Sequence, residues 1–274
     1  PPAIHEYLVV GQLGANLDPI WLVKIPGTGE GAIGSFPKVM EASDGSLIVS
    51  CGIHTAIDEH TSLIMRLSNV REVLWTRLIE QPIYDAWIHD LVSIDSEVFL
   101  ATGSADGFPI VIMFDLSGSV IWSRQFTVSG AGGIIYRAAY SPMVGLVVGG
   151  RCIADGNYEM LLARLNLDGE TIWAKRSAMP LNQVIQGLTL IGDSAVMISG
   201  VMASPSGTAS IYVGAFDVDG NLAWDKHYSS SPFTVVITDM LATSGGIELV
   251  GSIGPTSIST FGFHGKLDES GLVI

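Results

Sequence analysis

Short apolar runs of about four to seven residues alternate with clusters of Gly, Ser, Asp and Pro along the whole chain. Runs of this length, bounded by turn-forming residues, are typical of strands rather than helices. None approaches the roughly eighteen apolar residues that a membrane-spanning helix needs. The pattern therefore predicts an all-β protein with a large buried core and no membrane insertion.

A tryptophan recurs about every fifty residues, with a glycine four positions before it and a basic residue two positions after it. The tryptophans are Trp21, Trp75, Trp122, Trp173 and Trp224; the glycines are Gly118, Gly169, Gly220 and Gly271; the bases are Arg77, Arg124, Lys175 and Lys226. A fixed period of this length indicates a repeat architecture.

Each repeat has the pattern of four strands. In the copy that ends at Trp173, we expect strands at 136–140, 145–149, 160–165 and 171–175, with a tight turn at Asp168-Gly169. A glycine closes the second strand of every copy, at Gly52, Gly103, Gly150, Gly200 and Gly251. Four-stranded units that pack on one another around a ring form a β-propeller.

We therefore predict one β-propeller domain over residues 1–274, with five complete repeats and an extra N-terminal hairpin. A β-sandwich is the second choice, but it gives no reason for a tryptophan in register. In the hairpin, 6–10 matches a third strand and 19–21 a fourth. Two closures stay open: the hairpin completes the last blade, or it pairs with a neighbouring molecule. The ring then has five or six blades.

The segment 161–169 followed by Trp173 resembles the repeats of secreted bacterial and archaeal propellers of the quinoprotein-like or delta-60 type. The similarity spans nearly the whole chain and implies a fold, not an activity. The quinoprotein signature Thr-Gly-x-x-x-Trp is not present, so the resemblance implies no quinone, and we expect no cofactor.

The chain carries 13 basic against 27 acidic residues, a net charge of −14. Such a surface repels phosphate backbones, which disfavours nucleic acid as a partner. Charged residues make up only 15% of the chain, a composition common in extracellular, cell-surface and virion proteins. Cys51 and Cys152 lie in apolar strands about a hundred residues apart, and we expect two buried free thiols.

The candidate binding residues lie on the face that carries the second–third and inter-blade connections. We expect those connections to be long and different in each copy, as at 53–61 and 203–210, whereas the opposite face carries tight turns. The candidates are Tyr84, Trp87, His89, Asp90, Tyr136 and Arg137. Aromatic side chains here suit sugars or peptides. His89 and Asp90 are the best pair for the channel, although neighbours on a strand point to opposite sides.

A candidate metal site lies in the predicted loop that holds His54, Asp58, Glu59 and His60, since two imidazoles and two carboxylates suit zinc. A solvated polar loop is the preferred interpretation, because nothing orients these ligands as a helix would. The match to G-x-G-x-x-G at 29–34 precedes Pro37 and a strand, not the helix that a dinucleotide site requires. No nucleophile elbow or Cys–His pair is present.

These observations favour a non-enzymatic extracellular, cell-surface or virion propeller that binds proteins, with self-assembly through the hairpin as one form of that role. The alternative is a carbohydrate-binding or carbohydrate-active propeller that uses the long-loop face.

Overall fold

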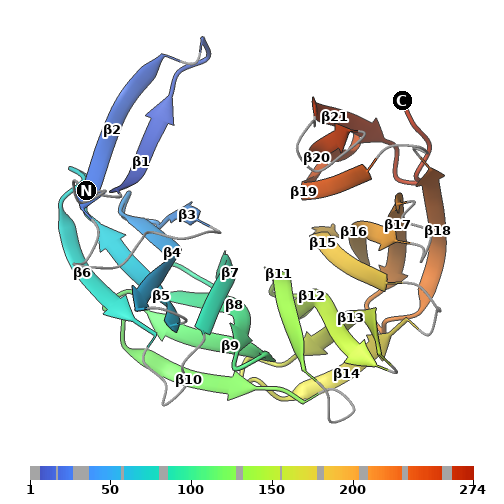
Figure 1. The fold of residues 1–274 in the computed structure, drawn as a ribbon, viewed down its shortest axis with the longest axis horizontal. Coiled ribbons are helices and arrows are strands. Elements are labelled where there is room, and N and C mark those ends of the chain that lie inside the picture. The colour runs from blue at the N-terminus through green and yellow to red at the C-terminus, as the bar shows by residue number, and fades with distance from the viewer. Residues whose placement is uncertain are drawn as a thin grey trace.

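The computed structural model describes residues 7–16, 18–26, 37–56, 59–79, 86–127, 132–154, 156–177, 182–203, 209–229, 234–254 and 261–274. Those residues form five antiparallel blades around a central channel, which is a five-bladed β-propeller, and a separate two-stranded sheet at the N-terminus (Figure 1). The β-sandwich is thereby excluded. Within this part of the chain no helix is long and apolar enough to cross a membrane.

The hairpin sheet consists of β1 (Tyr7–Leu13) and β2 (Pro19–Pro26). Four blades follow with four strands each: β3 (Lys38–Glu41), β4 (Leu47–Ala56), β5 (Glu59–Leu67) and β6 (Val73–Leu78); β7 (Ala86–Ser93), β8 (Val98–Ala105), β9 (Phe108–Asp115) and β10 (Val120–Gln125); β11 (Gly133–Ser141), β12 (Gly145–Ala154), β13 (Asn157–Leu165) and β14 (Thr171–Arg176); β15 (Asn182–Ile191), β16 (Ala195–Ala203), β17 (Ala209–Asp217) and β18 (Leu222–Ser229). The fifth blade has β19 (Thr234–Thr243), β20 (Gly246–Gly254) and β21 (Phe261–Leu267), and a bridge from Leu267 to Val273 stands where a fourth strand would start.

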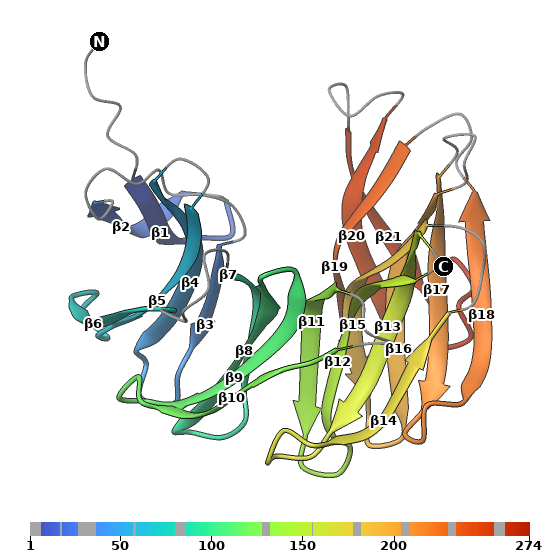
Figure 2. The ribbon, with the colours of Figure 1, turned by 60° about the horizontal axis from the view of Figure 1, so that its bottom comes forward.

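The first strand of each blade lies innermost and the fourth outermost (Figure 1). The β11–β12 and β13–β14 turns lie together at one end of their blade, as the alternating strand direction requires (Figure 2). The predicted strands of the repeat ending at Trp173 are confirmed, and so is the N-terminal hairpin. The hairpin forms its own sheet beside β3–β6 and does not complete the last blade.

The core is divided among the interfaces between neighbouring sheets. Alternate residues of each second and third strand face the preceding sheet, and the others face the following one, as the pleat dictates. Leu8 and Val10 of β1 pack on Val49 and Met65 of the first blade, so the hairpin covers that blade as another blade would. Cys51 and Cys152 are buried and free, as predicted.

The recurring glycine of the second strand has a structural cause. The first strands β7, β11, β15 and β19 each carry a β-bulge, at His89, Tyr136, Gln186 and Thr238. The bulge brings a backbone carbonyl of the first strand against the facing glycine. A Cβ on Gly103 would lie 1.7 Å from the carbonyl oxygen of Trp87, and the matching distances at Gly150, Gly200 and Gly251 are 1.9, 1.9 and 2.2 Å. Only glycine fits there.

The first blade departs from this rule. Counted from the strand partners of Trp75 and Trp122, Leu63 in β5 is equivalent to Ile110 in β9. The second-strand partner of Leu63 is Cys51, whereas that of Ile110 is Gly103. Gly52 thus lies one residue beyond the glycine position of the other blades. The prediction that a glycine closes the second strand was also wrong, since each second strand continues past its glycine, as β4 does to Ala56.

The recurring tryptophan fastens each blade to the next. The indole of Trp122 donates its N–H to the carbonyl oxygen of Leu167 at 2.8 Å and covers Gly169, which has φ of 79°. Trp75 and Trp173 make the same hydrogen bond to Leu116 and Val218, at 3.1 and 2.9 Å. The glycine four positions before each tryptophan is therefore the residue against which the tryptophan of the preceding repeat packs.

In the first blade an arginine takes the place of that glycine. Arg71 has φ of 71°, a left-handed conformation that costs a non-glycine residue free energy. Its guanidinium lies 4.3 Å from the centre of the Trp21 ring, a distance at which cation–π attraction compensates part of that cost. The hairpin is thus held to the first blade by a variant of the same contact.

Several connections predicted to be long are shorter than expected, because the flanking strands extend further. β4 reaches Ala56 and β5 begins at Glu59, with Ile53 paired to Thr61 across the two strands. The β8–β9 connection is Asp106-Gly107, and only two residues separate β12 from β13. The prediction of a loop from Ile53 to Thr61 was wrong, because β-strand pairing continues through apparently polar sequence.

Candidate functional site

The central channel holds a cavity of about 810 Å³ whose wall includes residues from all five first strands. Its lining runs from Asp90 and Arg137 toward Ser141 and Gly192, which lie at the first–second turns. The cavity therefore opens toward the tight-turn face.

Four charged side chains form a ring around this channel. Lys38, Asp90, Arg137, Gly187 and Asp239 occupy the same register position on the five first strands. Lys38 Nζ lies 3.4 Å from Asp90 Oδ1 and 4.0 Å from Asp239 Oδ2, and Arg137 Nε lies 3.6 Å from Asp239 Oδ1. Arg137 also donates to the carbonyl oxygen of Thr238. Two cations and two anions thus balance, and they connect four blades across the channel.

The fourth blade contributes no charge because a side chain does not fit. A Cβ on Gly187 would lie 2.3 Å from Ser199 Oγ and 2.7 Å from Met240 Cβ. The gap in the ring therefore results from crowding. We infer that this charge ring has a structural role, linking the blades, since its charges are already paired with one another.

Burial dominates the electrostatics at Asp90 and His89. It raises the pKa of Asp90, while Lys38, Arg137 and the N–H of Ala138, which Asp90 accepts at 3.0 Å, act in the opposite direction. Burial lowers the pKa of His89 to about 4, aided by the positive charges of Arg137, Arg151 and Lys38. His89 is consequently uncharged at neutral pH.

On the side of the charge ring away from the cavity lies a cluster of aromatic side chains and one arginine. The rings of His89 and Tyr136, both at bulges, meet edge to face with centroids 4.9 Å apart. The guanidinium of Arg151 in β12 lies 5.8 Å from the centre of the Tyr136 ring and 4.0 Å from that of Tyr158. We call Tyr136, Arg151 and Tyr158 the stacked-arginine cluster.

The structure brings four of the sequence candidates together: His89, Asp90, Tyr136 and Arg137 lie at the channel wall on β7 and β11. Trp87 lies earlier on β7, and Tyr84 is outside the described residues. Of the candidate metal ligands, His54 and His60 face each other in backbone register, but their side chains, that of Glu59 and all of Asp58 are outside the described part. Sequence reasoning missed Lys38, Asp239 and Arg151. Lys38 and Asp239 share the register position of Asp90 and Arg137, and that equivalence would have found them.

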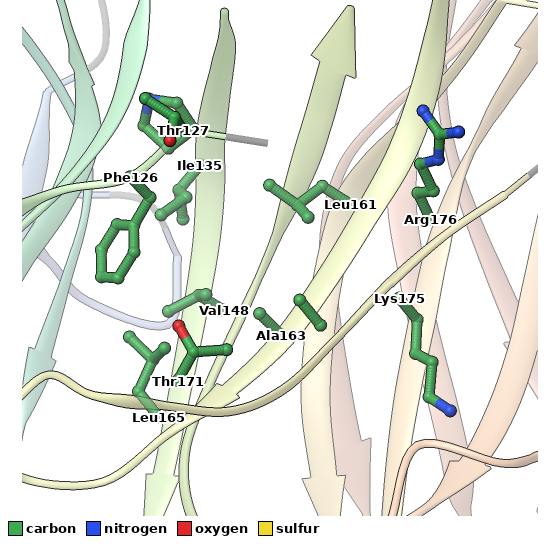
Figure 3. Close-up of a pocket in the computed structure, with 12 residues that line it drawn as sticks. Phe126, Thr127, Ile135, Val148, Leu161, Ala163, Leu165, Thr171, Lys175 and Arg176 are labelled. Atoms are coloured by element: carbon green, nitrogen blue, oxygen red, sulfur yellow. The ribbon is translucent and has the colours of Figure 1, made fainter. Parts of the chain in front are cut away.

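A second recess lies between the second and third blades. Its volume is about 410 Å³, and Figure 3 shows Phe126, Ile135 and Leu165 along one side, with Lys175 and Arg176 at the other. Arg176 is paired with Glu159 at 3.5 Å. The recess is an apolar gap between packed blades, and Lys175 and Arg176 are the charged side chains in its lining.

The two ends of the arc have opposite character. The hairpin face turned away from the first blade carries four exposed apolar side chains beside Lys24, which pairs with Val9: Val9, Leu13, Ile20 and Leu22 are 57, 53, 62 and 59% exposed. We call these four residues the hairpin face.

The outer face of the fifth blade is polar where the other blades are apolar. Glu248 stands at the register position of Met197, and His264 at that of Val213, both of which are buried against the fifth blade in the fourth. Glu248 pairs with His264 at 3.2 Å and with Lys266 at 3.7 Å. These side chains make the outer face of the fifth blade more polar than that of the fourth.

No family model matches the chain, and no curated protein matches it. Solved structures with a propeller fold do. Drosophila Plexin A in complex with Semaphorin 1b aligns with a TM-score of 0.52 at 9% identity, over 99% of this chain and 79% of that one. A puromycin hydrolase mutant aligns with a TM-score of 0.52 at 13% identity, over 92% of this chain and 39% of that one. The β-propeller domain of the Trilobed protease from Pyrococcus furiosus aligns with a TM-score of 0.44 at 10% identity, over 88% and 71%. At these identities the likeness shows the fold alone.

Proposed function

We propose that this propeller is a non-enzymatic protein-interaction module that assembles with a second copy of itself through the hairpin face. The observation that carries the proposal is the exposure of Val9, Leu13, Ile20 and Leu22 together on one side of a two-stranded sheet. The equivalents of Val9 in the blades include Leu63 and Leu161, which are buried against the preceding sheet. A contiguous apolar face of this kind marks an interaction site.

The fifth blade is a poor partner for that face. Burying Glu248, Lys266 and the imidazole of His264 against leucine, isoleucine and valine side chains would remove charged and polar groups from water without new partners. If the hairpin faces of two copies pack on each other, by contrast, apolar side chains meet apolar side chains. Such a pair is related by a two-fold axis, which is the commonest symmetry of soluble oligomers. This argues against the hairpin docking onto the last blade, in the same molecule or in the next.

The charge and composition of the chain support a site of action outside the cell, on its surface or in a virion, as does the resemblance to secreted propeller repeats of the delta-60 type. The Plexin A structure, which is a complex with Semaphorin 1b, is an example of a related fold in a protein that binds another protein. These points support the proposal at the level of fold and composition.

The test is the mass of the protein in solution, measured by light scattering over a range of concentrations. We expect a dimer that dissociates when Leu22 and Val9 are both replaced by Asp. Leu74→Asp is the matched control, since Leu74 is 51% exposed on β6, a fourth strand as β2 is. A wild-type chain that stays monomeric at high concentration, or a dimer that Leu74→Asp disrupts as much as the double variant, would refute the proposal.

A further inference from the structure

The stacked-arginine cluster is the part of the channel that the fold does not require. Arg151 directly follows Gly150 in β12, and the residues that follow the equivalent glycines are Ser104, Val201 and Ser252. Small or aliphatic side chains therefore suffice at this position in three other blades. An arginine held between two tyrosine rings in one blade alone is a departure from the repeat that packing does not explain.

The guanidinium is held but not neutralised. Tyr158 lies 4.0 Å from it and Tyr136 5.8 Å, so the aromatic rings restrict its position and leave N–H groups at its edge. Among the described residues no carboxylate lies within ion-pair distance of Arg151. Glu159, on the neighbouring strand β13, pairs with Arg176 instead. Asp90 and Asp239 are engaged by Lys38 and Arg137.

The cluster adds a positive charge beside a ring whose own charges balance, although the chain as a whole carries −14. Lys38, Arg137 and Arg151 are near enough to His89 for their charges to act on it together, and His89 packs edge to face on Tyr136. Lys38 and Arg137 are paired with Asp90 and Asp239, so an anion here would meet one positive charge that the ring does not balance, that of Arg151. Arg151 and Tyr136 are half-buried and Tyr158 is 37% exposed, so the site is open to solvent on one side.

We propose that Arg151, flanked by Tyr136 and Tyr158, binds the carboxylate group of a small organic acid. A guanidinium fork matches a carboxylate in a bidentate geometry, and each charge-assisted hydrogen bond is stronger than a neutral one. A sugar acid fits best, because the tyrosine rings and hydroxyls beside the fork suit a sugar ring and its hydroxyls. The overall acidity of the chain disfavours polyanions such as nucleic acid. This site is separate from the hairpin face and does not depend on it.

The test is an NMR titration of the arginine side-chain N–H signals with glucuronate, and with glucose and acetate as comparison ligands. We expect glucuronate to shift the Arg151 signal saturably, and glucose to leave it unchanged at the same concentration. Acetate should bind at least threefold more weakly than glucuronate. Acetate binding equal to that of glucuronate would overturn the assignment to a sugar acid while keeping the carboxylate site.

Variants separate recognition from packing. Arg151→Gln should weaken glucuronate binding at least tenfold, and Arg151→Lys, which keeps the charge but not the fork, should retain part of the affinity. Arg71→Gln is the matched control, since Arg71 also stacks on an aromatic ring, that of Trp21. Glucuronate affinity that is unchanged in Arg151→Gln, or lost equally in Arg71→Gln, would overturn the proposal.

Discussion

The contact between Trp122 and Gly169 allows a sharp test of how the blades are held together. Gly169 and Gly156 both have positive φ, of 79° and 80°, and both belong to the third blade. A Cβ on Gly169 would lie 3.0 Å from the Trp122 ring and 2.9 Å from Arg124 Cγ, whereas a Cβ on Gly156 would have nothing within 4 Å. Replacing each glycine by Ala therefore separates the cost of backbone conformation from the cost of displacing the indole.

The expected magnitudes differ accordingly. An alanine in the left-handed region costs about 1–2 kcal/mol, and this applies to both variants. At Gly169 the displaced ring adds about 1–3 kcal/mol of overpacking. We expect Gly169→Ala to destabilise the protein by roughly 2 kcal/mol more than Gly156→Ala does, a difference of about 4–8 °C in Tm for a chain of this size.

Urea unfolding and calorimetry measure both variants, and a third measurement isolates the contact. In a Trp122→Leu background, the extra cost of Gly169→Ala over Gly156→Ala should shrink, because the ring that it strikes is gone and the flexible side chain of Arg124 is left to move. Equal destabilisation by the two glycine variants in the wild-type background would refute the argument that the tryptophan of one blade rests on the turn of the next.

Three further outcomes follow from the same structure. Gly103→Ala should prevent stable folding in an expression and circular-dichroism assay, since its Cβ would lie 1.7 Å from a backbone oxygen, whereas Gly107→Ala, with nothing within 4 Å, should fold. Arg71→Ala should melt below wild type, because it keeps the positive φ and loses the Trp21 contact, and Arg71→Gly should melt at or above wild type; the reverse order contradicts the strain argument. The pKa of His89 is lowered to about 4, so the unfolded chain binds more protons between pH 6.5 and 4, and the free energy of unfolding should fall by up to about 3 kcal/mol as pH drops through that window. His89→Gln should remove that slope, and a slope unchanged in the variant would contradict the assignment.

Much of the fold is predictable because residues close together in the sequence determine the turns and strands of each repeat. Asp168-Gly169 predicts a turn from the positive φ that glycine supplies, and Trp173 sets the register of the copy. The positions of the strands follow from those two markers and the apolar runs between them. The contact between the regularly spaced glycine and tryptophan cannot be read from the sequence, since Gly169 packs against Trp122 of the preceding blade, 47 residues away.

Other features depend on contacts that no local pattern contains. The strand pairing of Ile53 with Thr61 overrides a polar sequence that reads as a loop. Cys51 stands at the glycine position of the first blade, and the glycine of that copy, Gly52, follows one residue later, which only the strand pairing shows. Arg151 lies beside Tyr158 only because β12 and β13 pair in a particular register. That Arg151 departs from the repeat becomes apparent when three other blades are aligned by their strand pairing, which places Ser104, Val201 and Ser252 at its position.

The charged outer face of the fifth blade limits where this architecture can grow by duplication. A copied repeat inserted between the fourth and fifth blades would meet apolar surfaces on both sides, with Met197 and Val213 before it and Leu249 after it. A copy placed directly against the outer face of the fifth blade would meet Glu248, His264 and Lys266 instead. Gene duplications that lengthen such a protein would therefore be tolerated in the interior of the array before they are tolerated beyond its fifth blade.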